Sequence, residues 1–176
     1  FVARALDSDR KGLDETLTTA AHHRGTSFVE IYQNCPIFND GAFDDYKGPE
    51  AAERIVRLVD GEPILLGADR SKGVVRDPVN GSLTVTEVAQ VGMDHVVVHD
   101  ATRPDPSLAF ELAHLHDSGQ ISQIPLGILR SVSLPTYDDM VRDQLRLAGG
   151  SADDKPARDA ALQQLLRGND TWQVHN

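Results

Sequence analysis

The first part of the chain carries two short apolar runs with one longer segment of helical periodicity between them. Apolar residues dominate Phe1–Leu6 and Phe28–Tyr32, and runs of this length are typical of buried strands. In Lys11–His23 the apolar residues recur at helical spacing, and Asp9 stands where a helix N-cap is expected. Two strands joined through one helix form a βαβ unit, which predicts parallel pairing and a right-handed crossover.

Beyond residue 35 the pattern is less regular and the predicted elements are shorter. Residues 36–48 are rich in Asn, Asp, Gly and Pro, which predicts a loop. Asn80-Gly81 lies between two apolar runs and predicts the tight turn of a hairpin. The elements expected after the loop are a helix over Glu50–Val59, a strand over Pro63–Gly67, a hairpin over Gly73–Val85, a strand over His95–His99, a helix over Ser107–His116, a strand over Leu126–Val132, and helices over Tyr137–Leu147 and Pro156–Leu166.

Composition and charge narrow the classes of function. The chain has 40% hydrophobic but only 5% aromatic residues, so its core must consist mainly of Val, Ile, Leu and Ala. Its formal net charge of −10 argues against unaided binding of nucleic acid or an anionic membrane, which needs a basic surface. No apolar run approaches the roughly 18–20 residues of a membrane span, and the start lacks a signal-peptide pattern. We expect a cytoplasmic protein.

The sequence starts without methionine, directly on the apolar run Phe1–Leu6. A strand at a terminus needs neighbours to pair with, so we expect the chain to be the C-terminal part of a longer polypeptide. On this expectation, a single residue of the chain can belong to a functional site whose other residues lie outside the sequence.

The histidines and the acidic runs are interpreted as structural. His95 and His99 share one face of a predicted strand, whereas His114 and His116 diverge on a predicted helix. No cysteine or glutamate stands near any histidine at a spacing typical of zinc sites. Acidic runs such as Asp44-Asp45 lie in polar contexts, as solvated faces or helix caps do. Glycine-rich phosphate-binding motifs are absent from the sequence.

Cys35, the only cysteine, is the most informative candidate for chemistry because it follows the apolar run Phe28–Tyr32. In α/β folds, ligands and cofactors bind beyond the carboxyl ends of strands. The residue can be a buried apolar filler, a nucleophile, or one ligand of a metal site. A nucleophile needs an adjacent base, and no base is placed locally. Pro36 follows directly, and proline after cysteine is common near iron–sulfur ligands.

Several motifs together resemble one family of enzymes. The chain resembles the β subunit of 2-oxoacid:ferredoxin oxidoreductases, and most of all the 2-oxoglutarate type. The likeness extends over essentially the whole chain, and its ordered set of motifs is more specific than any single one. The motifs are Phe1–Arg4, Val29–Asn39 with its Cys-Pro-x-Phe-Asn stretch, Leu108–Ala113, Pro125–Arg130, Pro135–Tyr137 and Gly168–Trp172.

The resemblance implies an α/β fold: the C-terminal part of a thiamine-diphosphate-binding domain with a parallel sheet, followed by a smaller α+β extension. Residues 1–40 would end the thiamine-diphosphate-binding domain, 41–135 would form the C-terminal domain of the β subunit, and 136–176 a helical tail. Cys35 would be the fourth ligand of a [4Fe-4S] cluster whose other three cysteines precede this sequence. The motif for thiamine diphosphate and Mg²⁺ would also precede it, so no catalytic or coenzyme-binding residue is assigned within the chain.

The activity that the resemblance implies is oxidative decarboxylation of a 2-oxo acid to acyl-CoA and CO₂. Electrons would pass through the cluster to ferredoxin, and the α subunit of the same enzyme would be a partner. The chain alone is expected to be inactive.

Two alternatives to this interpretation stay open. The chain can be a complete, non-catalytic, acidic α/β binding module, with Cys35 as a core filler. It can also belong to a thiamine-dependent decarboxylase or synthase without a cluster, which has no need for a cysteine at this place. A Cys-x-x-Cys pair and a Gly-Asp-Gly-Asp motif encoded upstream would distinguish the oxidoreductase from the module.

Overall fold

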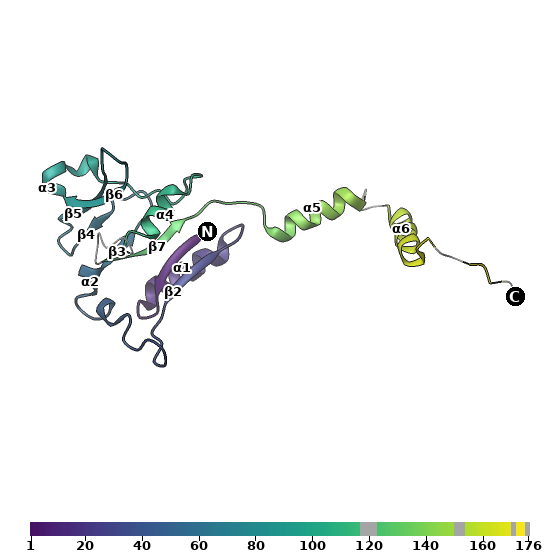
Figure 1. Cartoon of the computed structure of the whole chain (residues 1–176), viewed down its shortest axis with the longest axis horizontal. Helices are drawn as coiled ribbons and strands as arrows, with labels where there is room; N and C mark the ends of the chain where they lie inside the picture. The colour runs from purple at the N-terminus through teal and green to yellow at the C-terminus, as the bar shows by residue number, and fades with distance from the viewer. Residues whose placement is uncertain (117–122, 150–153, 170–171, 175–176) are drawn as a thin grey trace. The chain divides into compact units, whose positions relative to one another are not determined.

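The N-terminal βαβ unit forms as the hydrophobic pattern predicts. In the computed structural model, β1 (Val2–Leu6) and β2 (Phe28–Tyr32) pair in parallel, with α1 (Arg10–His22) between them in sequence (Figure 1). Asp9 is the N-cap of α1, and its side chain accepts a hydrogen bond of 3.2 Å from the Gly12 N–H. The structure describes residues 1–116, 123–149, 154–169 and 172–174.

The described residues belong to two compact units, Phe1–Leu134 and Pro135–Asn176. The predicted boundary near residue 40 stays a prediction. Each unit is considered separately below.

The first unit contains a four-stranded sheet in the order β2-β1-β7-β3. Strand β7 (Ile124–Arg130) runs antiparallel to β1, and β3 (Ile55–Leu58) runs parallel to β7. The α/β class is therefore confirmed. The sheet is mixed rather than wholly parallel, because β7 enters it against the direction of β1, and its parallel pairs are compatible with a thiamine-diphosphate-binding fold.

Strand β3 corrects part of the prediction. The helix expected over Glu50–Val59 is limited to α2 (Ala51–Arg54), and the chain then continues as β3. The burial of β3 alternates, with Val56 and Leu58 buried and Arg57 exposed, as in a strand. The β-branched Ile55 and Val56 favour extended backbone, and pairing with β7 decides the outcome over local helical spacing.

A second, antiparallel sheet contains the predicted hairpin. Its order is β4 (Leu65–Leu66), β5 (Lys72–Arg76) and β6 (Leu83–Glu87), and Gly81 in the turn has a φ of 74°. The strand expected over His95–His99 is wrong at its start, because Met93–His95 forms a 3₁₀ turn, η2. Val96 and Val98 then make only isolated bridges, to Val75 and Pro63. Two short elements complete this unit, η1 (Asp44–Tyr46) and α3 (Val88–Val91).

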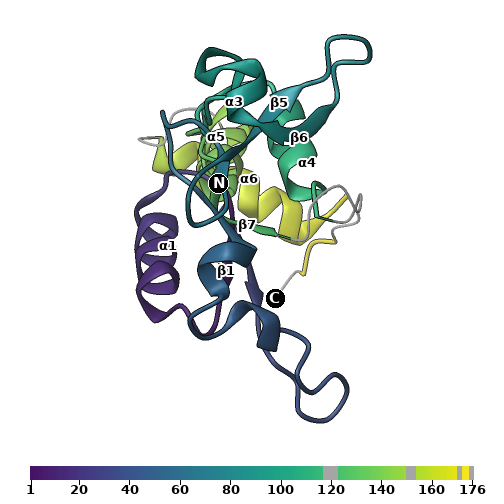
Figure 2. The ribbon, with the colours of Figure 1, turned by 90° about the vertical axis from the view of Figure 1, so that its left-hand side faces the viewer.

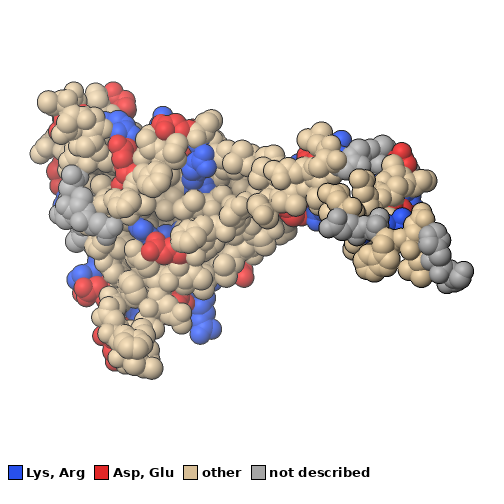
Figure 3. Space-filling model, turned by 45° about the vertical axis from the view of Figure 1, so that its right-hand side comes forward, with Lys and Arg blue, Asp and Glu red and all other residues tan. Residues whose placement is uncertain are grey.

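The main core joins the two sheets to α4 (Ser107–Ala113). Helix α4 buries Leu108 and Leu112 against strands of both sheets. Helices α1 and α4 lie on opposite sides of the larger sheet (Figure 2). On the face drawn in Figure 3, acidic and basic side chains of this unit are interspersed. The buried members of this core are Val56, Leu58, Ile64, Leu66, Val74, Leu83, Leu108, Leu112, Leu115 and Leu129.

The second unit contains two predicted helices, and both are confirmed. They are α5 (Tyr137–Gly149) and α6 (Lys155–Arg167). Asp154 caps α6 by accepting a hydrogen bond of 3.0 Å from the Ala157 N–H, and a proline stands in the first turn. Among the described residues, none of the helices combines the length and apolar content that a bilayer span requires.

Candidate metal-binding site

Cys35 lies in a tight turn soon after β2. The Asn39 N–H donates to the Cys35 carbonyl over 2.9 Å, and the two residues form an isolated antiparallel bridge. The turn between them therefore folds back over the cysteine. Cys35 is a free thiol of intermediate exposure and is not part of the buried core, which argues against its interpretation as a core filler.

The backbone of the turn stabilises the thiolate of Cys35. Hydrogen bonds from the Phe38 N–H and then the Ile37 N–H lower the pKa of the thiol, with a smaller contribution from Asn39, and together they outweigh desolvation. The thiolate is the form of cysteine that binds metal ions. Backbone N–H groups directed at a ligand sulfur also tune the potential of an iron–sulfur site. The donor atom and its surroundings therefore fit a cluster ligand.

The segment that carries Cys35, residues 33–42, is closed by contacts between its two ends. The Asn34 side chain donates to Asp40 Oδ1 over 2.9 Å and accepts from the Gly41 N–H over 2.8 Å. At its base, the Tyr32 and Phe43 rings stack with centroids 4.8 Å apart and an interplanar angle of 17°. Sequence analysis did not single out these contacts. The Asn-Cys-Pro order with Asp40-Gly41 downstream is the signal that could have indicated them.

Within the described ranges, no group of three or more histidine, cysteine, aspartate or glutamate residues could hold a metal ion. Cys35 can thus supply one ligand, and the others would have to come from other segments. Two of the histidines contact backbone carbonyls instead. The His99 ring is buried with its Nε2 2.7 Å from the Ile128 carbonyl, and the His114 Nδ1 lies 2.8 Å from the Phe110 carbonyl.

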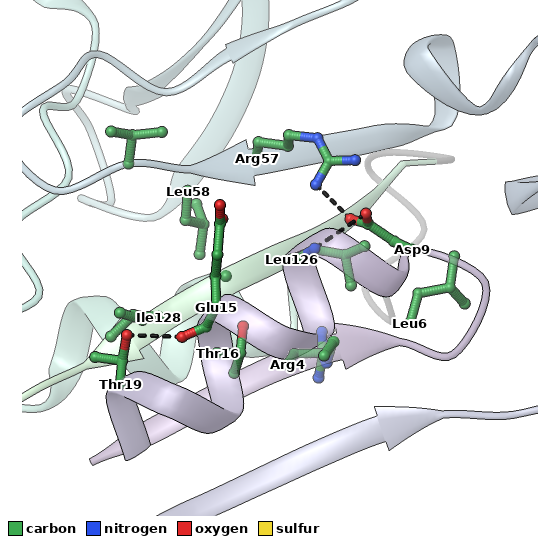
Figure 4. A pocket seen from close by; sticks show the side chains of 14 residues that line it. Arg4, Leu6, Asp9, Glu15, Thr16, Thr19, Arg57, Leu58, Leu126 and Ile128 are labelled. Atoms are coloured by element: carbon green, nitrogen blue, oxygen red, sulfur yellow. Dashed lines mark hydrogen bonds and ion pairs between the residues drawn. The ribbon is translucent and has the colours of Figure 1, made fainter. Parts of the chain in front are cut away.

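A separate, partly open cavity of about 290 Å³ lies between α1 and strands β7 and β3 (Figure 4). Leu58, Leu126 and Ile128 supply apolar lining. At its rim, Arg57 Nη1 bonds to Asp9 Oδ2 over 2.7 Å and links β3 to the N-terminus of α1. The sequence did not predict this ion pair, because the helix expected over Glu50–Val59 placed Arg57 outside the sheet.

The comparisons with known proteins bear on the family resemblance. No protein-family model matches the chain, and no solved structure matches it. Over 174 residues the chain is 48% identical to the 2-oxoglutarate oxidoreductase subunit KorB of Mycobacterium tuberculosis (strain ATCC 25618 / H37Rv). The chain is a homologue of KorB. The alignment covers 99% of this chain and 45% of KorB, so the chain spans less than half the length of that relative.

The similarity to KorB, named a 2-oxoglutarate oxidoreductase subunit, agrees with the resemblance drawn from the motifs. It includes the turn around Cys35, because nearly the whole chain is aligned.

Proposed function

We propose that the chain is part of the β subunit of a 2-oxoacid:ferredoxin oxidoreductase. The enzyme would convert 2-oxoglutarate to acyl-CoA and CO₂ by oxidative decarboxylation and pass the electrons to ferredoxin. The observation that carries the proposal is the 48% identity to KorB, named a 2-oxoglutarate oxidoreductase subunit, along 99% of the chain. An α subunit, ferredoxin, coenzyme A and the 2-oxo acid are the partners that this activity requires, in the cytoplasm.

Cys35 is the residue of the chain that we assign to a cofactor. Its thiolate, supported by the N–H groups of Phe38 and Ile37, would hold one iron of a [4Fe-4S] cluster. Such a cluster supplies one-electron transfer when bound. The other cysteine ligands would come from outside the sequence, because Cys35 is its only cysteine.

Thiamine diphosphate with Mg²⁺ would supply the decarboxylation chemistry of the whole enzyme. No residue of this chain is assigned to hold either. The chain would contribute the Cys35 thiolate, held in place by the hydrogen-bonded turn that follows β2.

The two alternative functions make different demands on Cys35. A binding module needs it only as packing, and its intermediate exposure outside the core does not favour that role. A cluster-free thiamine enzyme needs no thiolate here, whereas the turn is arranged to stabilise one.

The experiment is to replace Cys35 in the full-length subunit, purified without oxygen, and to measure iron and acid-labile sulfide. We expect about four of each per wild-type subunit. Cys35→Ser should lose most of both, because an alcohol is a poor iron ligand. Ile37→Ala is the matched control, since its side chain is 82% exposed in the same turn. It should keep the wild-type content.

Other outcomes would decide between the alternatives. Equal iron in wild type and Cys35→Ser would remove Cys35 from the ligand set. Absence of iron from both proteins would favour the enzyme without a cluster or the binding module.

A further inference from the structure

The tip of the closed segment 33–42 lies in solvent. The side chains of Ile37 and Phe38 are 82% and 89% exposed, so burial of the tip does not hold the turn in place. The N–H groups of the same two residues nevertheless face the Cys35 sulfur. Besides the Asn39–Cys35 hydrogen bond within the turn, the contacts that hold it lie at the ends of the segment, at Asn34 and at the stacked rings that flank it.

Asn34 joins the two ends of the segment through both groups of its amide. Its Nδ2 donates to Asp40 Oδ1 and its Oδ1 accepts from the Gly41 N–H, at 2.9 and 2.8 Å. A side chain must carry both a donor and an acceptor to make this bridge. An aspartate in its place would lack the donor and would stand against the Asp40 carboxylate. Because Asn34 directly precedes Cys35, the bridge fixes the backbone from which the cysteine projects.

The stacked rings connect the base of the segment to the core. The Arg4 guanidinium lies 5.1 Å from the centre of the Tyr32 ring, and Arg4 is itself held by Glu30 at 2.6 Å and by the Ala113 carbonyl at 3.1 Å. On the other side, Phe43 packs against a core cluster of Leu6, Ile124 and Leu126. The segment therefore starts and ends on groups that cannot move independently of the sheet.

We propose that Asn34 and the Tyr32–Phe43 ring pair are positioning residues that hold the Cys35 turn ready for its iron. This proposal rests on the proposed function, in which Cys35 is a cluster ligand. Replacing a residue that orients a metal ligand from behind typically costs about 10- to 100-fold in metal affinity. Neither Asn34 nor the rings would supply a ligand to the iron, so their loss should weaken and alter the cluster without removing the Cys35 ligand.

The test uses the full-length subunit and three readouts: iron content, the rate of iron loss to a chelator, and the electron paramagnetic resonance spectrum of the reduced cluster. Asn34→Ala should bind iron as the wild type does, lose it about 10-fold faster, and give an altered spectrum. Asn34→Asp should lose iron at least as fast, since it also faces Asp40. Gln33→Ala is the matched control. Gln33 is exposed and directly precedes Asn34, so this variant should behave as the wild type does.

A second pair of variants tests the rings and serves if Asn34→Ala does not fold. Phe43→Leu should accelerate iron loss, and Phe43→Tyr, which keeps a stacking ring, should restore the wild-type rate and spectrum. Wild-type rates and spectra in both Asn34→Ala and Phe43→Leu would overturn the proposal while Cys35→Ser still loses its iron. Full iron in Cys35→Ser would instead overturn the proposed function, and this inference with it.

Discussion

The two units of the chain use apolar side chains in opposite ways. In the first unit they form a core, and Leu112, Val74 and Ala3 are each 0% exposed. In the second unit they face solvent, with Leu147 at 78% and Leu165 at 79%. Helices α1, α5 and α6 each have 13 residues, so length does not separate the units. The comparison shows that a periodic pattern makes a helix without determining what covers it.

Helix α5 illustrates the point. Around the helix, Tyr137, Met140, Val141 and Leu145 fall on one face by their spacing. The opposite face carries ion pairs, such as that of Arg146 with Asp143. Pairs of this kind contribute only about 0.3–0.5 kcal/mol each, so they support the helix locally and do not replace a core.

The largest expected contrast comes from the same truncation made in each unit. Leu112→Ala removes a side chain from the closed core of α4 and should cost about 2–5 kcal/mol. Leu147→Ala removes one that is 78% exposed and should change stability by less than about 0.5 kcal/mol. Native-state hydrogen exchange of the full-length subunit measures both, through the opening free energies of amides in β7 and in α5.

The informative exception would be a large cost for Leu147→Ala. A loss comparable with that of Leu112→Ala would mean that Leu147 is covered in the assembled protein. The exposure of apolar side chains in the second unit would then be a property of the isolated chain and not of the assembled protein.

The same distinction explains what the sequence could predict. Both helices of the second unit and the N-terminal βαβ unit were predicted, because their patterns are local and complete. Ile55–Leu58 was wrongly assigned to a helix, since its structure depends on pairing with β7, which lies far along the chain. The strand expected over His95–His99 also depends on distant partners. Val96 and Val98 each make only one isolated bridge, so no regular strand forms there.

The candidate site divides in the same way. Cys35 was identified from its position after β2 and its motif, both of which are local. The contacts that close segment 33–42 were not identified, because they depend on Phe43 stacking on Tyr32 and on Asn34 spanning the turn to Gly41. Side-chain pairings of this kind carry no periodicity, so hydrophobic patterning does not reveal them.

Glycine substitutions give a second, smaller contrast. Gly127 has a φ of 120°, and a Cβ there would lie 2.8 Å from the Leu58 carbonyl oxygen within the paired strands. Gly127→Ala should therefore cost about 2–4 kcal/mol, from backbone strain and overpacking together. Gly168, after α6, has a φ of 64°, and no atom of the described residues lies within 4 Å of its Cβ position. Gly168→Ala should cost only about 1–2 kcal/mol, from backbone strain alone, because a φ of 64° with a ψ of −163° is adopted almost only by glycine.

Hydrogen exchange at β3 and β7 for Gly127→Ala, and at the end of α6 for Gly168→Ala, checks this pair. Equal losses of stability in the two variants would indicate that another group also lies close to Gly168 in the assembled protein.

The smallest contrast uses the two aspartate N-caps. Asp9 and Asp154 each accept one backbone N–H at the start of a helix, but only Asp9 also binds an arginine of another strand, Arg57. Asp154→Ala should cost about 1 kcal/mol or less, and Asp9→Ala up to about 2 kcal/mol. Protection of α1 and α6 amides against hydrogen exchange measures the two losses separately.

The dependence on pH separates the extra interaction of Asp9 from simple capping. Burial raises the pKa of Asp9, but the hydrogen bonds from Arg57 and from the Gly12 N–H outweigh it, so the pKa lies below its ordinary value. A depressed carboxyl pKa contributes stability above the unfolded value of about 3.9, and that contribution is lost as the pH falls through the folded value. The wild type should thus be more stable than Asp9→Ala at pH 7, and the difference in stability should shrink in acid. A difference that persisted unchanged at low pH would mean that packing of Asp9, rather than its charge, joins α1 to β3.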